Sequence, residues 1–488
     1  MTRSVRKMLY MGLDVGTQGV RCVVADEGGE VWAAQSVAFG ALNAAEVEGW
    51  YEQRPEDWRA AAEEAIRACT SQLGRRAEEI RAVAVDGTSG TIVPLDADFA
   101  PLCRGVMYND PRAKAEAADV HAAMGAHEAR LGLKFGASFS LPRILWFYRN
   151  RPELCAETRV FAHQADYVSG MLSGECAVTD ESNALKTGYD VLGRFWPETI
   201  ERLGMELSKF PRVVRSGERI GRVTAEAAAR TGLSTKTWVV GGSTDGCASA
   251  MSAGAVRAGD WASIIGTTFV LKGVTEHLVL DPDGACYSHR LPSGEWMLGG
   301  AGNIGGRCMN LARGGRSFDE LNRESEGLIP TGARCYPLVG RGERFPFVDP
   351  NFEAFYFGDI LSGKLYPAMM EGVGFAERLA FERVQALGCQ VGDTVCTAGG
   401  VCRSDLWLRI RAAILNRRLA VPRVVDAAMG MAMLAAAGDF GSLSAAARDM
   451  IQYEKIVEPE AELSRRYDEI YRRFEAELNL VRQNGRNQ

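Results

Sequence analysis

Three turns in this sequence combine glycine with a hydroxyl or a carboxylate, each directly after an apolar segment. They are residues 14–19 (DVGTQG), 245–246 (DG) and 266–268 (GTT). Glycine lets backbone N–H groups approach phosphate oxygens closely, and a carboxylate nearby can hold Mg²⁺, usually through water. Phosphoryl transfer from ATP needs these parts together with a base aligned on the attacking hydroxyl. Any one turn is ordinary, but all three together favour phosphate chemistry.

The segments around the first turn predict an α/β fold. Strands are expected at residues 8–13, 20–26 and 31–39, followed by a helix at 56–73 and a strand at 80–85. A three-strand meander followed by alternating helices and strands is typical of α/β domains.

The strand–turn pattern recurs later in the chain, after strands expected at residues 238–240, 261–265 and 394–397. Such a weak duplication indicates two similar domains, which we place at residues 1–252 and 253–488. Further helices are expected at residues 405–415, 427–437 and 465–482.

Composition narrows the class of protein. The 488 residues are 47% hydrophobic and 24% charged, and the net charge of −6 disfavours a nucleic-acid partner. The twelve cysteines form no CxxC pair, so they are expected to be small buried apolar groups in a reducing compartment. The apolar stretch at residues 8–13 is too short for a signal peptide, and no run of 18 apolar residues exists. We therefore expect a cytoplasmic protein without a membrane partner.

Two stretches of the sequence partly match other nucleotide-binding motifs. Gly300, Gly302 and Gly305 fit GxGxxG after an apolar strand, so a dinucleotide-binding oxidoreductase is an alternative, although no βαβ unit surrounds the motif. Gly363 and Lys364 are followed by leucine, not serine or threonine, which excludes a P-loop.

The turn sequences resemble the FGGY family of carbohydrate kinases over nearly the whole chain. The matching stretches are residues 14–21 (DVGTQGVR), 266–268 (GTT), 399–404 (GGVCRS) with Trp407, and 428–432 (AMGMA). Others resemble the D-ribulokinase branch, often called xylulose kinase-like: residues 86–91, 107–110, 163–166, 183–186 with 188–190, 342–346, 370–373 with 377–379, and Lys272. The sequence departs from that branch at Gly246, Val401 and Ser404.

The resemblance implies a two-domain actin-like ATPase (ribonuclease H-like) fold with a catalytic cleft between the domains. The N-terminal domain would bind sugar, and the C-terminal domain, closed by the last helix, would bind ATP. It implies Asp245 as the catalytic base, with Asp14 and Thr17 as further catalytic residues and Asp14 near Mg²⁺, through water. The implied sugar contacts are Ser89, Asp86, Asn109, Asp110 and Asp245. The implied ATP contacts are Gly16, Thr17, Gln18, Gly266, Thr267, Lys272, Gly305, Gly399, Gly400, Ser404 and Trp407.

Some roles stay open at the level of sequence. Asp245 is also a good helix N-cap, and Asn109 and Asp110 could bind sugar or close a turn. Trp407 could pack in the core, and Lys272 could neutralise phosphate or lie on the surface.

We therefore expect MgATP-dependent phosphorylation of a free ketopentose by a monomer or homodimer. D-Ribulose, giving D-ribulose 5-phosphate, comes first and D-xylulose second, and another polyol or sugar substrate of the FGGY family is a further alternative. The alternatives from other classes are the oxidoreductase and a catalytically silent, actin-like nucleotide-binding protein.

Overall fold

The computed structural model describes residues 7–361 and 363–486, which divide into two units. Unit 1 comprises Met1–Ser252, His289–Trp296 and Asp426–Gln452, and unit 2 comprises Ala253–Ser288, Met297–Val425 and Tyr453–Gln488. The chain first passes from unit 1 to unit 2 after Ser252. The later segments differ from the expectation, because residues 426–452 belong to unit 1.

Unit 1 is built on a six-stranded sheet in the order β11-β12-β5-β1-β2-β3. Its strands are β1 (Leu9–Val15), β2 (Gly19–Asp26), β3 (Val31–Ala38), β5 (Ile80–Gly87), β11 (Arg219–Arg222) and β12 (Trp238–Thr244). The first three form an antiparallel meander, whereas β5 runs parallel to both β1 and β12. The carboxyl ends of β1, β5 and β12 therefore lie at the same edge of the sheet.

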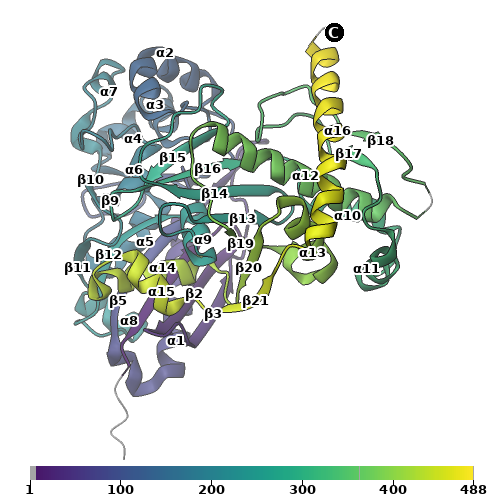
Figure 1. Ribbon diagram of the computed structural model, residues 1–488. Helices are drawn as coiled ribbons and strands as arrows, with labels where there is room; N and C mark the ends of the chain where they lie inside the picture. The colour runs from purple at the N-terminus through teal and green to yellow at the C-terminus, as the bar shows by residue number, and fades with distance from the viewer. Residues whose placement is uncertain (1–6, 362, 487–488) are drawn as a thin grey trace, which may run out of the picture. The chain divides into compact units, whose positions relative to one another are not determined.

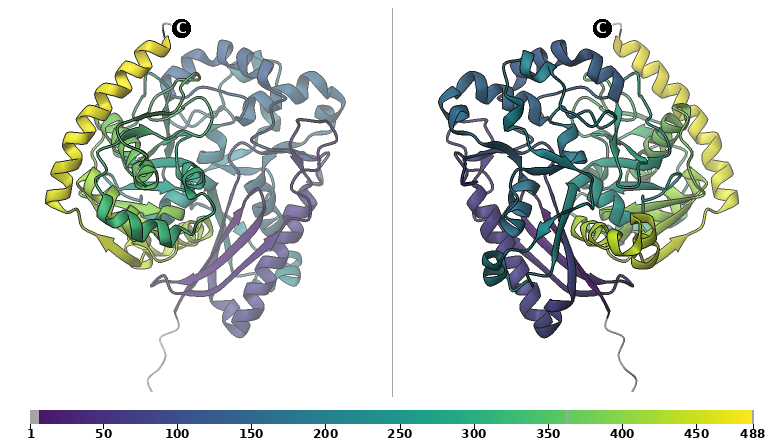
Figure 2. Two further views of the ribbon diagram at one scale, coloured as in Figure 1. Left: turned by 90° about the vertical axis from the view of Figure 1, so that its right-hand side faces the viewer. Right: turned by 90° about the vertical axis from the view of Figure 1, so that its left-hand side faces the viewer.

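Helices cover both faces of this sheet. The odd-numbered residues of β1, from Leu9 to Val15, join the core beneath α1 (Pro55–Leu73) and α5 (Gln164–Ser173). The opposite face of β1, β2 and β5 packs against α14 (Ala427–Phe440). Figure 1 shows α14 and α15 on the strands, and Figure 2 shows α1 running beside them.

The placement of α14 corrects the expected domain content. The helix consists almost entirely of small or flexible apolar residues, so it can lie very close to the sheet. At Gly12 of β1 the approach is so close that a Cβ atom would overlap the carbonyl oxygen of Ala428. Close packing on β1 therefore draws residues 426–452 into unit 1.

The remaining elements of unit 1 surround the sheet. A small sheet has the order β4-β7-β6-β8, and β9 pairs with β10. The bounds are β4 (Glu52–Gln53), β6 (Ile92–Leu95), β7 (Gly105–Val106), β8 (Val160–His163), β9 (Val178–Asp180), β10 (Arg212–Val214), α2 (Lys114–Leu131), α3 (Ser140–Asn150), α4 (Pro152–Glu157), α6 (Glu181–Leu185), α7 (Thr199–Arg202), α8 (Ala225–Thr231), α9 (Asp245–Ala253) and α15 (Leu443–Met450), with 3₁₀ turns at Gly74–Glu79 and Leu207–Lys209.

Unit 2 contains a seven-stranded sheet in the order β15-β16-β14-β13-β19-β20-β21. Its strands are β13 (Trp261–Ile265), β14 (Phe269–Thr275), β15 (Cys286–Arg290), β16 (Trp296–Ala301), β19 (Thr394–Ala398), β20 (Arg418–Pro422) and β21 (Tyr453–Val457), and β17 (Arg334–Tyr336) pairs separately with β18 (Phe355–Phe357). Its helices are α10 (Met309–Arg313), α11 (Phe318–Ser325), α12 (Leu365–Ala386), α13 (Asp405–Leu415) and α16 (Ala461–Arg486), with 3₁₀ turns at Gly306–Cys308, Glu326–Leu328 and Gly400–Arg403.

A buried ion pair joins the helices of unit 2 to its sheet. Arg411 of α13 donates to both carboxylate oxygens of Glu377 of α12, at 2.6 and 2.7 Å, and both side chains are fully buried. Arg411 also donates to Thr397 of β19, and Ser263 of β13 donates to Glu377. This network fixes α12 and α13 over β13 and β19, the strands that lead into the glycine turns at residues 266–268 and 399–400.

Two further expectations concern surroundings. All twelve cysteines are free thiols and ten are buried, so they serve as apolar packing groups. None of the helices in the described ranges combines the length and apolar character that a bilayer crossing demands. The cytoplasmic location stays a prediction.

Candidate functional site

Two carboxylates lie side by side where neighbouring strands of unit 1 end. Asp14 of β1 and Asp86 of β5 are direct partners in the parallel register. Asp86 is completely buried, and neither of its carboxyl oxygens has a hydrogen-bond partner among the described residues. Such an orphaned buried carboxyl group is costly unless a ligand compensates it.

Burial and neighbouring negative charge both act on this pair. Burial raises the pKa of Asp14 to about 6; contact with the Asp86 carboxyl opposes this shift, and the charges of Asp426 and Asp245 add to it. Burial, followed by the charges of Asp14 and Asp245, raises the pKa of Asp86 well above its usual range. A cation bound here would favour the ionised forms.

The pair fits Mg²⁺. Carboxylate oxygens are the ligands that magnesium prefers, and Asp86 offers unpartnered ones. Within residues 7–361 and 363–486, no group of three or more His, Cys, Asp or Glu side chains is arranged to ligate a metal. Magnesium would therefore keep most of its ligands as water and phosphate, as it commonly does.

The first glycine turn lines a cavity of unit 1. The Gly16 N–H donates to the Gly19 carbonyl at 2.9 Å, and buried Gln53 holds the Thr17 carbonyl at 2.8 Å. A cavity of about 500 Å³ is lined by Asp14, residues 16–21 and residues 36–38. The structure thus brings together the predicted residues Asp14, Gly16, Thr17 and Gln18.

Asp245 is the first residue of α9, directly after β12. Its side chain is partly exposed, and its Oδ1 accepts from the Gly246 N–H at 2.7 Å. Its charge acts on Asp14, Asp86 and Lys186. The expected base and the expected Mg²⁺ ligand therefore occupy one neighbourhood of unit 1.

The turn after β5 carries the predicted sugar-binding serine. Gln164 Oε1 accepts from both the backbone N–H and the hydroxyl of Thr88, at 2.9 and 2.7 Å. The next residue, Ser89, has a buried hydroxyl with no partner among the described residues. A buried, unpaired hydroxyl on a fixed turn is suited to a sugar hydroxyl. The fixing role of Gln164 was not assigned from sequence, although its motif was noted.

Asp110 and Asn109 differ in availability. The Asp110 carboxylate accepts from both Nε and Nη2 of Arg112, each at 2.8 Å, and from the Tyr51 N–H at 2.6 Å. Its acceptor capacity is already largely used, which supports the turn-closing alternative. Asn109 is exposed.

The second glycine turn lies in unit 2 after β13. The Gly266 N–H donates to the Thr268 carbonyl at 3.0 Å, and the Gly266 carbonyl accepts from the Gly306 N–H at 2.8 Å. The GxGxxG segment packs on this turn, since a Cβ atom on Gly305 would meet Thr268 backbone atoms. That segment therefore supports the second phosphate turn, and β16 lies between β15 and β14 rather than in a βαβ unit.

A cavity of about 480 Å³ in unit 2 is lined by five of the eight nucleotide contacts predicted in that unit. Gly266, Thr267, Gly400, Ser404 and Trp407 all line it. Trp407 is buried and also lines the cavity. Its Nε1 donates to the Met370 carbonyl at 3.2 Å, which holds the indole ring in place. The core-packing alternative for Trp407 is therefore correct, and its contact with a nucleotide stays a prediction.

Three nucleotide contacts predicted in unit 2 lie outside the lining of this cavity: Lys272, Gly305 and Gly399. Lys272 is a buried residue of β14 whose side chain packs against Gly299. The surface alternative for Lys272 is therefore wrong, and its contact with phosphate stays a prediction.

Two residues of the cavity were missed from the sequence. Asn322 Oδ1 accepts from the Tyr366 hydroxyl at 3.0 Å and from the Ser404 hydroxyl at 3.1 Å. Two donors on the carbonyl side orient the amide, so its NH₂ group is left for a ligand acceptor. Nothing in the local sequence of α11 or α12 marks Asn322 or Tyr366, because only the fold brings them to Ser404.

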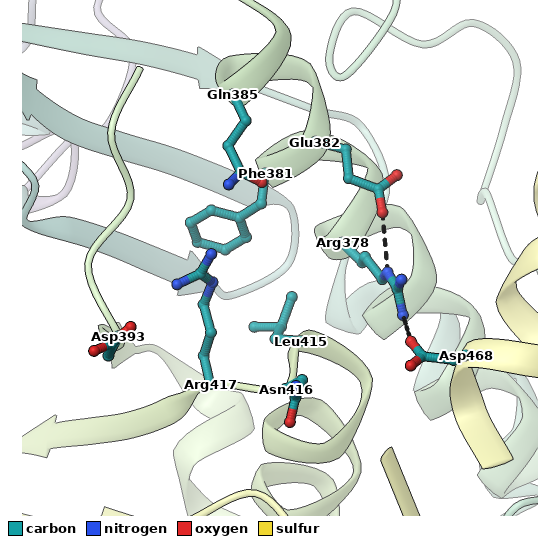
Figure 3. A pocket seen from close by; sticks show the side chains of 9 residues that line it. All are labelled: Arg378, Phe381, Glu382, Gln385, Asp393, Leu415, Asn416, Arg417 and Asp468. Atoms are coloured by element: carbon teal, nitrogen blue, oxygen red, sulfur yellow. Dashed lines mark hydrogen bonds and ion pairs between the residues drawn. The ribbon is translucent and has the colours of Figure 1, made fainter. Parts of the chain in front are cut away.

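A further pocket of unit 2, shown in Figure 3, has no predicted residue in its lining. Arg378 lies between Glu382, at 3.0 Å, and Asp468. Arg417 donates to the Val391 and Gly392 carbonyls. These cations are engaged by α12, α16 and the loop before β19, which indicates a structural role.

Known proteins resemble this chain over most of its length. The chain matches the N-terminal domain model of the FGGY family of carbohydrate kinases at residues 9–252 and the C-terminal domain model at residues 255–438. The chain is 28% identical over 477 residues to a xylulose kinase of Bacillus subtilis (strain 168), covering 94% of this chain and 95% of that protein. A xylulose kinase of Escherichia coli (strain K12) is also 28% identical, covering 84% and 86%.

Solved structures show the same architecture. A kinase from Brucella ovis, titled a xyloylose kinase, superposes with a TM-score of 0.88 at 27% identity, over 97% of this chain and 99% of that one. The xylulose kinase from Rhodospirillum rubrum has a TM-score of 0.88 at 25% identity, over 98% and 100%.

Fold and site together define a two-domain actin-like ATPase that acts on sugars. The chain belongs to the FGGY family of carbohydrate kinases, and it is an ATP-dependent sugar phosphotransferase with Mg²⁺ as the metal cofactor. This confirms the family, fold and enzyme class expected from the sequence.

Proposed function

We propose that this kinase phosphorylates a free ketopentose, with D-xylulose as the preferred acceptor. Relatives named xylulose kinase match nearly the full length of the chain. They favour D-xylulose over D-ribulose, the acceptor placed first from sequence motifs. The two ketoses differ only in configuration at C3, so the choice depends on contacts to that hydroxyl.

The observation that carries the acceptor site is the pair of unsatisfied groups beside two further carboxylates. The Asp86 oxygens and the Ser89 hydroxyl are buried without partners among the described residues. Asp14 and Asp245 lie in the same neighbourhood. A cation near Asp86 and a sugar hydroxyl on Ser89 would satisfy all of these groups.

The chain's residues then take defined parts in the reaction. Asp245 accepts the proton of the acceptor hydroxyl, whose oxygen forms a bond to the γ-phosphorus. The bond from that phosphorus to the β–γ bridging oxygen breaks, and ADP leaves. Asp14 and Asp86 would hold Mg²⁺, which neutralises phosphate charge when bound. The turn at residues 14–19 would donate backbone N–H groups to phosphate.

The nucleotide base would occupy the unit 2 cavity. Trp407 supplies an apolar wall, and the Asn322 amide supplies a donor to a base nitrogen. These contacts bind and orient the nucleotide without entering the chemistry.

ADP release with a panel of acceptors tests the proposal. D-Xylulose, D-ribulose, L-ribulose, glycerol and ribitol would be compared at fixed MgATP, with a no-sugar control. We expect kcat/KM to be highest for D-xylulose, with D-ribulose next. Preference for glycerol or ribitol, or no sugar-dependent ADP release at all, would contradict the proposal.

D-Ribulose is retained as the second candidate because residues 86–91 and 183–186 resemble the D-ribulokinase branch. A higher kcat/KM for D-ribulose in the same panel would select it.

A further inference from the structure

Residues 183–186 form a motif to which the reaction gives no role so far. The motif ends the short helix α6, whose N-cap Asp180 accepts from the Asn183 N–H and from Asn183 Nδ2. Asn183 Nδ2 also lies 3.3 Å from the Ser243 carbonyl. Because Ser243 lies near the end of β12, this contact holds α6, and Lys186 directly after it, against that strand. The expected base Asp245 follows Ser243 by two residues.

Lys186 follows α6 directly and is partly buried. Its Nζ lies 3.5 Å from the Ser89 carbonyl, at the limit of a hydrogen bond, and 5.1 Å from the centre of the Phe139 ring. No carboxylate in the described part of the chain forms an ion pair with it. A lysine ammonium has three donors, and one long contact leaves most of that capacity for a ligand.

The turn at Ser89 and Gly90, which Lys186 contacts, is held in place by Arg143. Arg143 is fully buried and donates to the Gly90 carbonyl at 2.8 Å and to the Tyr108 carbonyl. Ser89, between these anchors and Lys186, keeps its hydroxyl buried without a partner. An underused ammonium and an unpaired hydroxyl therefore belong to one preorganised turn, and such groups in a native protein indicate a ligand.

We propose that Lys186 is a substrate-positioning residue that, together with the Ser89 hydroxyl, binds oxygen atoms of the sugar and directs the acceptor hydroxyl toward Asp245. The inference deepens the proposed function and rests on it. The ligand chemistry is that of an uncharged polyhydroxylated ketose, whose carbonyl and hydroxyl oxygens accept from an ammonium group.

The pH dependence follows from the groups that face Lys186. Burial lowers the pKa of Lys186 to about 8, whereas the nearby charge of Asp245 raises it. Arg143, Cys247 and Tyr108 are the other titratable neighbours. The cation is the binding form, so kcat/KM for the sugar falls as Lys186 loses its proton above pH 8.

The test compares Lys186→Met and Lys186→Arg with the wild type. We expect Lys186→Met to lower kcat/KM for the sugar about 10–100-fold, the range for one hydrogen bond to a charged group, with KM for ATP within about twofold. Lys186→Arg should recover part of the loss. The fall in kcat/KM above pH 8 should vanish in Lys186→Met.

Lys209→Met is the matched control, because Lys209 is also partly buried and donates to a backbone carbonyl, that of Cys155. Thermal melting of each variant, with and without sugar, separates loss of folding from loss of sugar binding. If Lys186→Met does not fold, the pH profiles of the wild type and Lys186→Arg carry the test, since arginine should move the fall to higher pH.

The outcomes separate the two proposals. A wild type that turns over no ketopentose contradicts the proposed function and this inference with it. An active wild type with unchanged sugar kinetics in Lys186→Met contradicts this inference alone. Equal losses for sugar and ATP, or a fall above pH 8 that persists in Lys186→Met, also overturn it, and the latter assigns the fall to another neighbour.

Discussion

Asp245 is partly exposed and is the first residue of α9. Its carboxylate can therefore contact a ligand while the backbone that carries it stays fixed. Its charge reaches both members of the Asp14–Asp86 pair. A base in this position needs only to take a proton late, because the transition state of phosphoryl transfer is loose.

Asp245→Asn should therefore lower kcat by about 10²–10⁴-fold, the usual contribution of a positioned base. ATP affinity should stay near that of the wild type, because the cavity proposed to bind the adenine base lies in unit 2 and Asp245 lies in unit 1. ADP-release kinetics and calorimetric titration with ATP measure the two quantities.

Asp98→Asn, at an exposed aspartate of the same unit, is the control and should leave kcat unchanged. Near-normal turnover in Asp245→Asn would remove the base from the mechanism.

Single residues were predictable from sequence where their chemistry is local. Asp14, Asp245 and Gly266 stand in glycine turns after apolar strands, so neighbouring residues alone mark them. Asn322 and Asp426 carry no such local mark. Asn322 meets Ser404 only through folding, and Asp426 acts on Asp14 from more than 400 positions further along the chain.

Among the elements, α14 packs against the backbone of its neighbours. A Cβ atom on Gly430 would overlap the Ala248 carbonyl oxygen of α9, the helix that begins with Asp245. A Cβ atom on Gly438 of the same helix would meet nothing within 4 Å. The helix thus provides a matched pair of glycines.

Gly430→Ala should destabilise the protein by about 1–3 kcal/mol, since the overlap is with backbone that cannot rotate away. It should also lower kcat, because α9 must shift. Gly438→Ala should be neutral or stabilising by up to about 1 kcal/mol through helix propensity. Urea unfolding of both variants measures the difference, and equal stabilities would refute the close approach of α14 to α9.

Alternating and continuous apolar segments were enough to predict the main strands and helices, including β1, β13, α13 and α14. The partner of α14 was not predictable, because an apolar helix pattern does not state which sheet it covers. Its packing depends on glycines that lie far apart in sequence, such as Gly12 and Gly430.

For the whole molecule, the buried apolar residues form separate clusters. One cluster gathers around β1, β5 and α1 in unit 1, and the other gathers around β13, α12 and α16 in unit 2. Proteins with more than one core commonly depart from two-state unfolding.

Scanning calorimetry without ligands should therefore resolve two transitions. Gly430→Ala should lower mainly the transition of unit 1. Glu377→Gln leaves Arg411 buried without its carboxylate partner. It should lower the free energy of unfolding of unit 2 by about 3–5 kcal/mol, and with it mainly the transition temperature of that unit. One transition that both variants shift equally would contradict this division.

The division into two domains was visible in the sequence as a repeated strand–turn pattern. Chain length and the repeat suggest two cores, but neither shows that a late segment returns to the first core. That return depends on the surface match between α14 and the sheet.

The position of residues 426–452 in unit 1 also affects how the protein folds during synthesis. The ribosome must translate the 200 residues from 253 to 452 before unit 1 receives its last helices. At about 5–20 residues per second this takes roughly 10–40 s. During that interval the sheet face that α14 covers in the folded protein has no helix on it. We therefore expect early chaperone binding to the nascent chain and poor solubility of a fragment truncated at residue 252.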